Sequence, residues 1–349
     1  MTGKIKQQSS TNAWFYAQRG ETFRLLAGNT EGANTNLSQA LSCFNSALNE
    51  DPNYIWAIGR RGVTYRQLTN LELAEQDFQT VITKTPSDPW GYAQLGETYR
   101  LMLFRSGSTN PESDFAKKAI EKLEKAISLY PEYAWAHAHL GATYYWIQPY
   151  KKAKDCLNKA IDLTDRSYAW AFAYLGSVYY KESDYEKAEL YWKTAKRLDT
   201  RVLPDTAQYD MALLSHLTGR FDEAIEQYNQ QLQEKPNDPL ALYGIALATI
   251  GKNGVDKAKT EIDRTSTRLQ EHEHSAAFYM LGSLAYLQGK SDQAQEYLQR
   301  ATTFRDDLTS KSNEPFSIIK RSLAVNDLSW LGLDNDERFQ SLISPVRKA

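Results

Sequence analysis

Cysteine is scarce in this 349-residue chain, and the sequence signatures of most catalytic chemistry are missing. The two cysteines, Cys43 and Cys156, form no Cys-x-x-Cys motif, which excludes the common redox and zinc-ribbon arrangements. The chain also has no glycine-rich phosphate loop, no Gly-x-Ser-x-Gly motif and no zinc-binding helix signature. We therefore expect no enzymatic activity, no catalytic residue, no metal and no cofactor.

Long apolar runs and an excess of one charge are absent as well. Lys and Arg number 41 against 43 Asp and Glu, for a net charge of −2, so no basic excess favours nucleic acid as a partner. No apolar run is long enough to span a membrane. The first eleven residues are polar and lack the apolar core of a secretory signal. These features predict a soluble, cytoplasmic protein with two reduced thiols.

The chain does contain an internal repeat. An alanine, a bulky residue, a small residue and a proline recur at an offset of 34 residues, as Ala40, Phe44, Ala47 and Pro52 and then Ala74, Phe78, Val81 and Pro86. A period of this length is typical of helical hairpins that bury their apolar faces only by stacking on their neighbours. The repeat therefore predicts a helical solenoid.

The same residues identify a family resemblance. Glycine followed three residues later by an aromatic recurs in Gly20–Phe23, Gly62–Tyr65, Gly96–Tyr99, Gly141–Tyr144 and Gly176–Tyr179, and Leu281-Gly282 opens a further unit. With the alanine and proline spacing, this pattern resembles the tetratricopeptide repeat (TPR). The resemblance implies an all-α, right-handed superhelical solenoid of antiparallel helix pairs with about eight repeats.

The repeats divide the chain into three parts. Residues 1–11 are a polar segment, residues 12–307 the solenoid, and residues 308–349 capping helices. Two repeats carry insertions near residues 27–36 and 104–113, which we expect to be solvated spacers, with contact points as the alternative. The repeats cover approximately residues 13–54, 55–88, 89–133, 134–168, 169–203, 205–238, 239–273 and 275–307.

In this family the first helix of each repeat, helix A, lines a concave groove through positions 2, 5, 6, 9, 12 and 13, counted so that the glycine is position 8. Position 2 is tryptophan in five successive repeats. Each tryptophan can pack against a neighbouring repeat or contact a partner, and the sequence leaves both readings open. The tryptophans are Trp14, Trp56, Trp90, Trp135 and Trp170.

Two other groove columns change along the chain. Position 5 is small in repeats one to five, as Ala17, Gly59, Ala93, Ala138 and Ala173, and becomes Tyr209, Tyr243 and Tyr279 in repeats six to eight. We expect an open groove floor in the first five repeats. Position 12 reads Arg24, Arg66 and Arg100 and then Tyr145 and Tyr180.

Two of the three arginines have an acidic neighbour on their own helix. Glu21 and Glu97 precede Arg24 and Arg100 by three residues, a spacing that permits ion pairs. Arg66 has Val63 at that place, so we expect Arg66 and Arg60 to be free to meet an acidic group. Gln94, His139 and Tyr174 occupy groove positions as well.

These columns predict a protein-interaction scaffold whose groove binds a peptide or helix that is apolar with at least one acidic residue. The alternatives are a regulatory sensor whose superhelix responds to a peptide or small ligand, and a self-associating module. The co-chaperone members of the family bind a terminal carboxylate through Lys and Asn at positions 5 and 9, which this chain lacks. The predicted contact residues are Trp14, Arg24, Trp56, Arg60, Arg66, Trp90, Gln94, Arg100, Trp135, His139, Tyr145, Trp170, Tyr174 and Tyr180.

Overall fold

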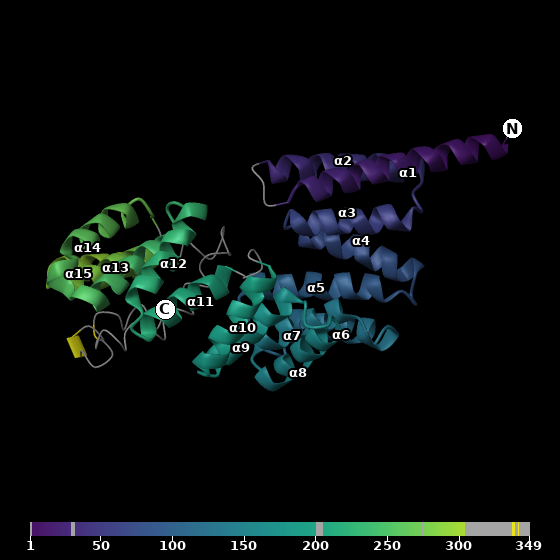
Figure 1. Ribbon diagram of the computed structural model, residues 1–349. Coiled ribbons are helices and arrows are strands. Elements are labelled where there is room, and N and C mark those ends of the chain that lie inside the picture. Colours follow the sequence, from purple (N-terminus) through teal and green to yellow (C-terminus); the bar gives the residue numbers. More distant parts are fainter. Residues whose placement is uncertain are drawn as a thin grey trace. The chain divides into compact units, whose positions relative to one another are not determined.

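The computed structural model describes residues 2–28, 32–199, 205–273 and 275–303 and the positions 337, 338 and 341. These residues form sixteen helices and no strand (Figure 1). The all-α fold of stacked helix hairpins is therefore confirmed. The predicted capping helices of residues 308–349 lie outside the described residues, apart from those three positions.

The chain divides into two compact units, Met1–Tyr174 and Leu175–Ala349, whereas the repeat pattern predicts one continuous body. In a solenoid each repeat contacts only its neighbours, so contacts gather locally. Helix α9 (Ala169–Lys181) begins in the first unit and ends in the second. The first unit otherwise consists of α1 (Thr2–Leu26), α2 (Ala33–Glu50), α3 (Ile55–Gln67), α4 (Leu71–Lys84), α5 (Pro89–Ser106), α6 (Asp114–Leu129), α7 (Ala134–Ile147) and α8 (Tyr150–Asp162).

The second unit continues the same alternation of paired helices along the chain (Figure 1). Its helices are α10 (Tyr185–Leu198), α11 (Asp205–Leu217), α12 (Phe221–Glu234), α13 (Pro239–Asn253), α14 (Val255–Leu269), α15 (Ser275–Leu287) and α16 (Ser291–Thr303). None of the sixteen described helices combines the length and apolarity that a membrane span requires.

Aspartate followed by proline starts a helix in both units. The side chain of Asp88 accepts a hydrogen bond from the Trp90 amide at 2.9 Å, and Asp238 does the same for Leu240 at 3.0 Å. A carboxylate at the N-cap satisfies amides that the helix leaves unpaired, and proline fits the first helical position because its missing N–H is not needed there. The aspartate–proline pair therefore sets the start of α5 and α13.

In six of the eight repeats the hairpin closes where a glycine of helix A meets a large side chain of helix B, and in repeats six and seven Ala212 and Ala246 take the glycine position. A Cβ placed on Gly96 would lie 2.6 Å from Cγ of Leu123, and one on Gly176 would lie 2.5 Å from Cδ1 of Trp192. Neither distance leaves room for a methyl group, so glycine is required for the two helices to approach this closely. The repeated Leu-Gly pattern is thus a packing signal.

Two segments differ from the sequence prediction. Helix α1 begins at Thr2, so residues 2–11 of the polar segment that the sequence separates from the solenoid belong to the first helix. The insertion between α5 and α6 is also more than a solvated spacer. Trp146 of α7 donates a hydrogen bond from Nε1 to the carbonyl of Ser108 at 2.7 Å, and its ring lies 4.6 Å from that of Phe104. The loop is therefore held against repeat four.

Candidate partner-binding site

The predicted contact residues of the first unit lie on the helices A of successive repeats. Within α3, α5, α7 and α9, a tryptophan at position 2 is followed one turn later by a planar polar side chain at position 6. Residues four apart share one helix face. The resulting surface, which we call the A-face, carries Trp56, Arg60, Trp90, Gln94, Trp135, His139, Trp170 and Tyr174.

Two of the position-6 side chains of the A-face, Arg60 and His139, stack between successive tryptophans. The guanidinium carbon of Arg60 lies 5.3 Å from the ring centroid of Trp56 and 5.8 Å from that of Trp90. The imidazole of His139 lies 3.8 Å from the ring of Trp135 and 4.5 Å from that of Trp170. The tryptophan column is therefore part of an alternating stack that joins repeats, with its rings half-buried.

The small residues at position 5 make room for this stack, so the expected open floor is wrong. A Cβ on Gly59 would lie 2.8 Å from Cζ3 of Trp90. Ala17, Ala93 and Ala138 are fully buried. The space beside Gly59 is already filled by the tryptophan of the next repeat. The sequence shows the tryptophans at position 2 and the small residues at position 5. The two are linked by an offset of one repeat, because Gly59 lies against the tryptophan of the following repeat.

Trp14 departs from the other tryptophans because 55 % of it is exposed. Its predicted position is on α1 of repeat one, and no described side chain stacks on it. It is consequently the tryptophan of the column with the largest free surface.

A buried ion network lies at the centre of the A-face. Arg100 donates two hydrogen bonds to Glu97, from Nε to Oε2 at 2.6 Å and from Nη2 to Oε1 at 2.9 Å. Nδ1 of His139 lies 2.6 Å from Oε2 of Glu97, and Arg100 also hydrogen-bonds the Tyr174 hydroxyl. These contacts join repeats three, four and five through one carboxylate.

The network controls the protonation of its members. Burial alone would raise the pKa of Glu97, but Arg100 and His139 outweigh it and hold that pKa well below its usual value. Burial lowers the pKa of His139, with Glu97 opposing the shift. His139 is therefore neutral at pH 7, where its Nδ1–H donates to the ionised Glu97.

Arg66 is the arginine of the column that has no carboxylate partner among the described residues. It donates from Nη1 to the carbonyl of Gln94 at 3.2 Å and from Nη2 to Oε1 of Gln94 at 2.7 Å. Burial lowers the pKa of Arg66, Glu97 opposes that shift, and Arg100 and Arg24 add to it. The guanidinium of Arg66 is therefore hydrogen-bonded by neutral groups, while Arg100 and Arg24 add positive charge around it.

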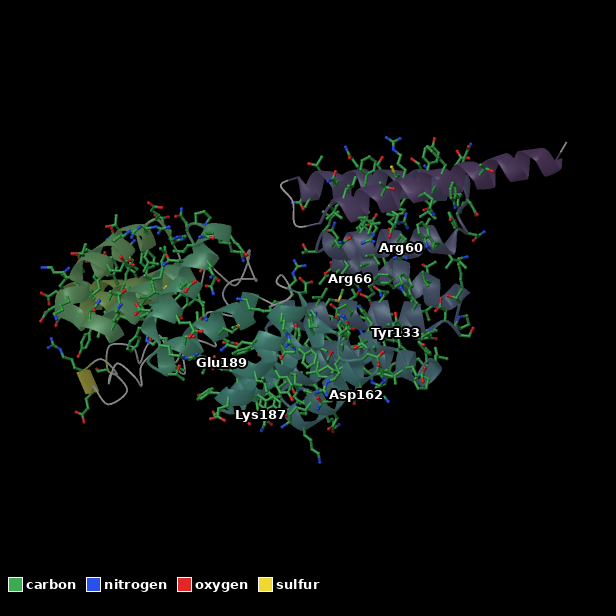
Figure 2. All side chains as sticks on the ribbon, viewed as in Figure 1. Arg60, Arg66, Tyr133, Asp162, Lys187 and Glu189 are labelled. Carbon is green, nitrogen blue, oxygen red and sulfur yellow. The ribbon has the colours of Figure 1, made fainter. Side chains whose placement is uncertain are left out.

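Arg60, unlike Arg66, has a carboxylate nearby. The prediction that both arginines are free is therefore wrong for Arg60. Nη1 of Arg60 lies 3.8 Å from Oε1 of Glu21, which also accepts from Arg24 at 2.7 Å. Glu21 therefore serves two arginines, because α1 and α3 bring Arg60 close to a carboxylate that the sequence assigns to Arg24 alone. Figure 2 labels Arg60 and Arg66 on α3 and Tyr133 just before α7.

Three other predicted contact residues are buried. Gln94, His139 and Tyr180 are 6 %, 8 % and 4 % exposed, so they offer little surface to a partner. Gln94 and His139 instead position Arg66 and Glu97. Tyr145 is half-buried and packs edge-on against Tyr174 at 5.8 Å.

Within the described part of the chain, no group of His, Cys, Asp and Glu could hold a metal ion. A surface hollow of about 710 Å³ lies along α4, lined by side chains from Glu72 to Lys84, and not on the helices A. Cys43 and Cys156 are free and only partly buried.

Stacked helix hairpins with glycine or alanine at each crossing define an α-solenoid of helical repeats. Two segments of the chain, residues 150–239 and 275–307, match family models described as tetratricopeptide repeat. These matches and the stacked hairpins support a tetratricopeptide repeat protein, and the sixteen described helices fit eight repeats.

Solved structures show the same fold. A tetratricopeptide repeat protein from Parabacteroides merdae is 17 % identical, with 76 % of this chain and 96 % of that chain covered and a TM-score of 0.51. The Cut9–Hcn1 hetero-tetramer of the APC/C is 14 % identical, with 82 % and 52 % covered and a TM-score of 0.55. A comparison with curated protein sequences found no match.

Proposed function

We propose that this protein is a non-enzymatic, cytoplasmic interaction scaffold that binds an apolar segment of a partner protein on the A-face, with an acidic residue of that segment at Arg66. The tetratricopeptide repeat fold supports a role in protein–protein interaction. The position of the site within that fold is the specific part of the proposal. Two free thiols agree with a reducing compartment.

The unneutralised charge of Arg66 carries the proposal. Arg24 and Arg100 each meet a glutamate on their own helix, with oxygen–nitrogen distances of 2.7 and 2.6 Å. A half-buried arginine that contacts only neutral groups, the Gln94 side chain and carbonyl and the ring of Phe78 at 5.6 Å, gains most from a carboxylate, because a charge-assisted, two-pronged hydrogen bond replaces weaker neutral contacts.

The surroundings of Arg66 favour a single negative charge. Arg66 and Arg100 are positive, Glu97 is ionised, and the Glu21 carboxylate pairs with Arg24, so these five side chains together carry one positive charge. A carboxylate balances that sum, whereas a doubly charged group would face repulsion from Glu97. The half-buried tryptophan rims provide the apolar contact area for the rest of the segment.

Selection of random peptides displayed on phage tests this function without a known partner. The wild-type protein is expected to enrich apolar peptides with Asp or Glu at one fixed position, and Arg66→Gln should enrich peptides without that preference. Arg105→Gln is the matched control, because Arg105 is exposed at the end of α5 and contacts only the Thr69 carbonyl at 3.4 Å.

The possible results separate the two parts of the proposal. Enriched peptides without an acidic position would refute the role of Arg66. Failure of the wild-type protein to enrich any peptide would refute binding on the A-face.

A further inference from the structure

The outward face of α1 is an apolar surface that no described helix covers. Trp14, Phe15, Leu25 and Leu26 are 55 %, 56 %, 65 % and 58 % exposed. At 100° per residue these four side chains fall within about 120° of one another around the helix, with Gln18 and Thr22 between them. Isolated exposed leucines are common on proteins, but four large apolar side chains on three turns of one face mark an interaction surface.

In the next two repeats the tryptophan that corresponds to Trp14 is covered. Trp56 of α3 packs against Phe44 of the preceding α2, with 6.5 Å between ring centroids, and Trp90 of α5 packs against Phe78 of α4 at 5.9 Å. In each case helix B of one repeat covers helix A of the next. The exposed apolar side chains of α1 are of the kind that a neighbouring helix covers.

The pattern on α1 repeats itself when the helix is reversed. Trp14 and Phe15 lie as far before Gly20 as Leu26 and Leu25 lie after it. An antiparallel copy of α1, turned about the level of Gly20, would place two aromatic rings opposite two leucines at both ends. Gln18 of one copy would then lie opposite Thr22 of the other, where small and uncharged side chains allow close approach.

Charge agrees with this self-pairing. The face between Trp14 and Leu26 contains no acidic or basic side chain, and Arg19 lies at its edge with its guanidinium 5.6 Å from the ring centroid of Phe23. Two copies therefore bring no like charges together at the centre. A head-to-tail contact would instead need a different surface as a complement, whereas a two-fold contact needs only this one.

We infer that the outward face of α1 is a homodimer interface, in which two copies of this chain pair through antiparallel α1 helices centred on Gly20. The surface is separate from the A-face network of Glu97 and Arg66. It buries the exposed apolar side chains of both copies and leaves Arg66 accessible.

Sedimentation equilibrium of the full chain tests the interface. The wild-type protein should dimerise as its concentration rises through the micromolar range, and Leu25→Asp with Leu26→Asp should raise the dissociation constant by about tenfold or more. Leu190→Asp is the matched control, because Leu190 is 61 % exposed on α10 and should leave dimerisation unchanged. A wild-type protein that stays monomeric, or a dimer that the double variant leaves intact, would overturn the inference.

Disulfide trapping tests the antiparallel register. In a background with Cys43→Ser and Cys156→Ser, Gln18→Cys and Thr22→Cys are made in separate chains and mixed under oxidising conditions. Antiparallel pairing predicts a cross-linked dimer between the two variants and much less between identical ones. Preferential cross-linking of identical variants would show a parallel contact and overturn the proposed arrangement. Circular dichroism of each variant checks that its helices are intact.

Discussion

In the first unit the aromatic side chains of helix A stand at position 2 and the small ones at position 5, whereas in repeats six to eight position 5 is tyrosine and position 2 is not aromatic. Gly59 faces Trp90, whereas Tyr243 is 1 % exposed and shares a core cluster with Ala276 at position 2 of the next repeat. Both arrangements fill the space between successive helices A. The first leaves half-buried rings on the surface, and the second puts its aromatic in the core.

The buried carboxylates of the two units differ in the same way. Glu97 lies between Arg100 and His139, and its pKa is lowered. Asp210 occupies position 6 of repeat six, is 6 % exposed, and makes no ion pair or hydrogen bond with the described residues. Burial raises the pKa of Asp210 to about 6, with Lys181 opposing the shift. Compensation by neighbours, and not burial alone, thus sets the sign of each shift.

Glu97→Gln should give the largest effect. It leaves Arg100 without its carboxylate partner and removes the negative charge that favours the charged form of Arg66, which together cost about 3 kcal/mol of unfolding free energy at neutral pH. Because the folded-state pKa of Glu97 is lowered, this contribution is present above the unfolded value of about 4.3 and is lost as pH falls below it. Urea unfolding followed by tryptophan fluorescence reports mainly the first unit, which holds six of the eight tryptophans, namely Trp14, Trp56, Trp90, Trp135, Trp146 and Trp170.

Glu124→Gln is the control for this experiment. Glu124 is exposed and accepts one hydrogen bond from the Tyr144 hydroxyl at 3.2 Å, so its loss should cost less than about 0.5 kcal/mol. If the two variants were equally stable, the buried network would not hold the repeats together.

Asp210→Asn should raise the unfolding free energy, whereas Glu97→Gln lowers it. The folded-state pKa of Asp210 is raised, so its stabilising contribution is present below the unfolded value of about 3.9 and is lost as pH rises through about 6. The variant should therefore be more stable than the wild type by about 2 kcal/mol above pH 7, with no gain below about pH 4. Hydrogen exchange of the α11 and α13 amides measures this locally.

Asp222→Asn provides the comparison for Asp210→Asn. Asp222 is on the surface of α12, where its side chain is 79 % exposed and pairs with Lys252. A pH-independent effect of Asp210→Asn, equal to that of Asp222→Asn, would show that Asp210 is compensated after all.

His139→Gln should give the smallest effect of the three. Glutamine is the residue that repeat three has at this position, as Gln94, and it retains a planar side chain with a donor for Glu97, so about 1 kcal/mol is lost at pH 7. The folded-state pKa of His139 is lowered, so its contribution is present above the unfolded value of about 6.5 and is lost as pH falls. The variant should unfold with less pH dependence than the wild type between about pH 7 and pH 5.

His139→Phe serves as the second variant in the same titration. It keeps a ring between Trp135 and Trp170 but gives Glu97 no donor, so it should be less stable than His139→Gln. Equal stability of the two would mean that only the stacking matters.

The sequence predicts the fold well because the repeat signals are local. Gly96 and Leu123 pack within one hairpin, and Asp88 with Pro89 starts one helix. Each of these signals can therefore be recognised within a single repeat. The predicted loop between α5 and α6 is correctly placed, but its hydrogen bond to Trp146 is not visible locally.

The site is harder to predict because its contacts join different repeats. Glu97 and Arg100 are three residues apart, and their ion pair is correctly predicted. His139 reaches Glu97 from 42 positions away, and Arg60 reaches Glu21 from 39. Their partners depend on how one hairpin is stacked on the next, which side-chain spacing alone does not fix.

A double-mutant cycle on a selected acidic peptide tests the central claim that Arg66 is the open charge of the A-face. Isothermal titration compares the peptide with its Glu→Gln or Asp→Asn counterpart, each against the wild-type protein and Arg66→Gln. Either change alone should weaken binding about tenfold, and both together should weaken it no further than one. If the two losses were fully additive, the acidic residue would bind elsewhere and the claim would be wrong.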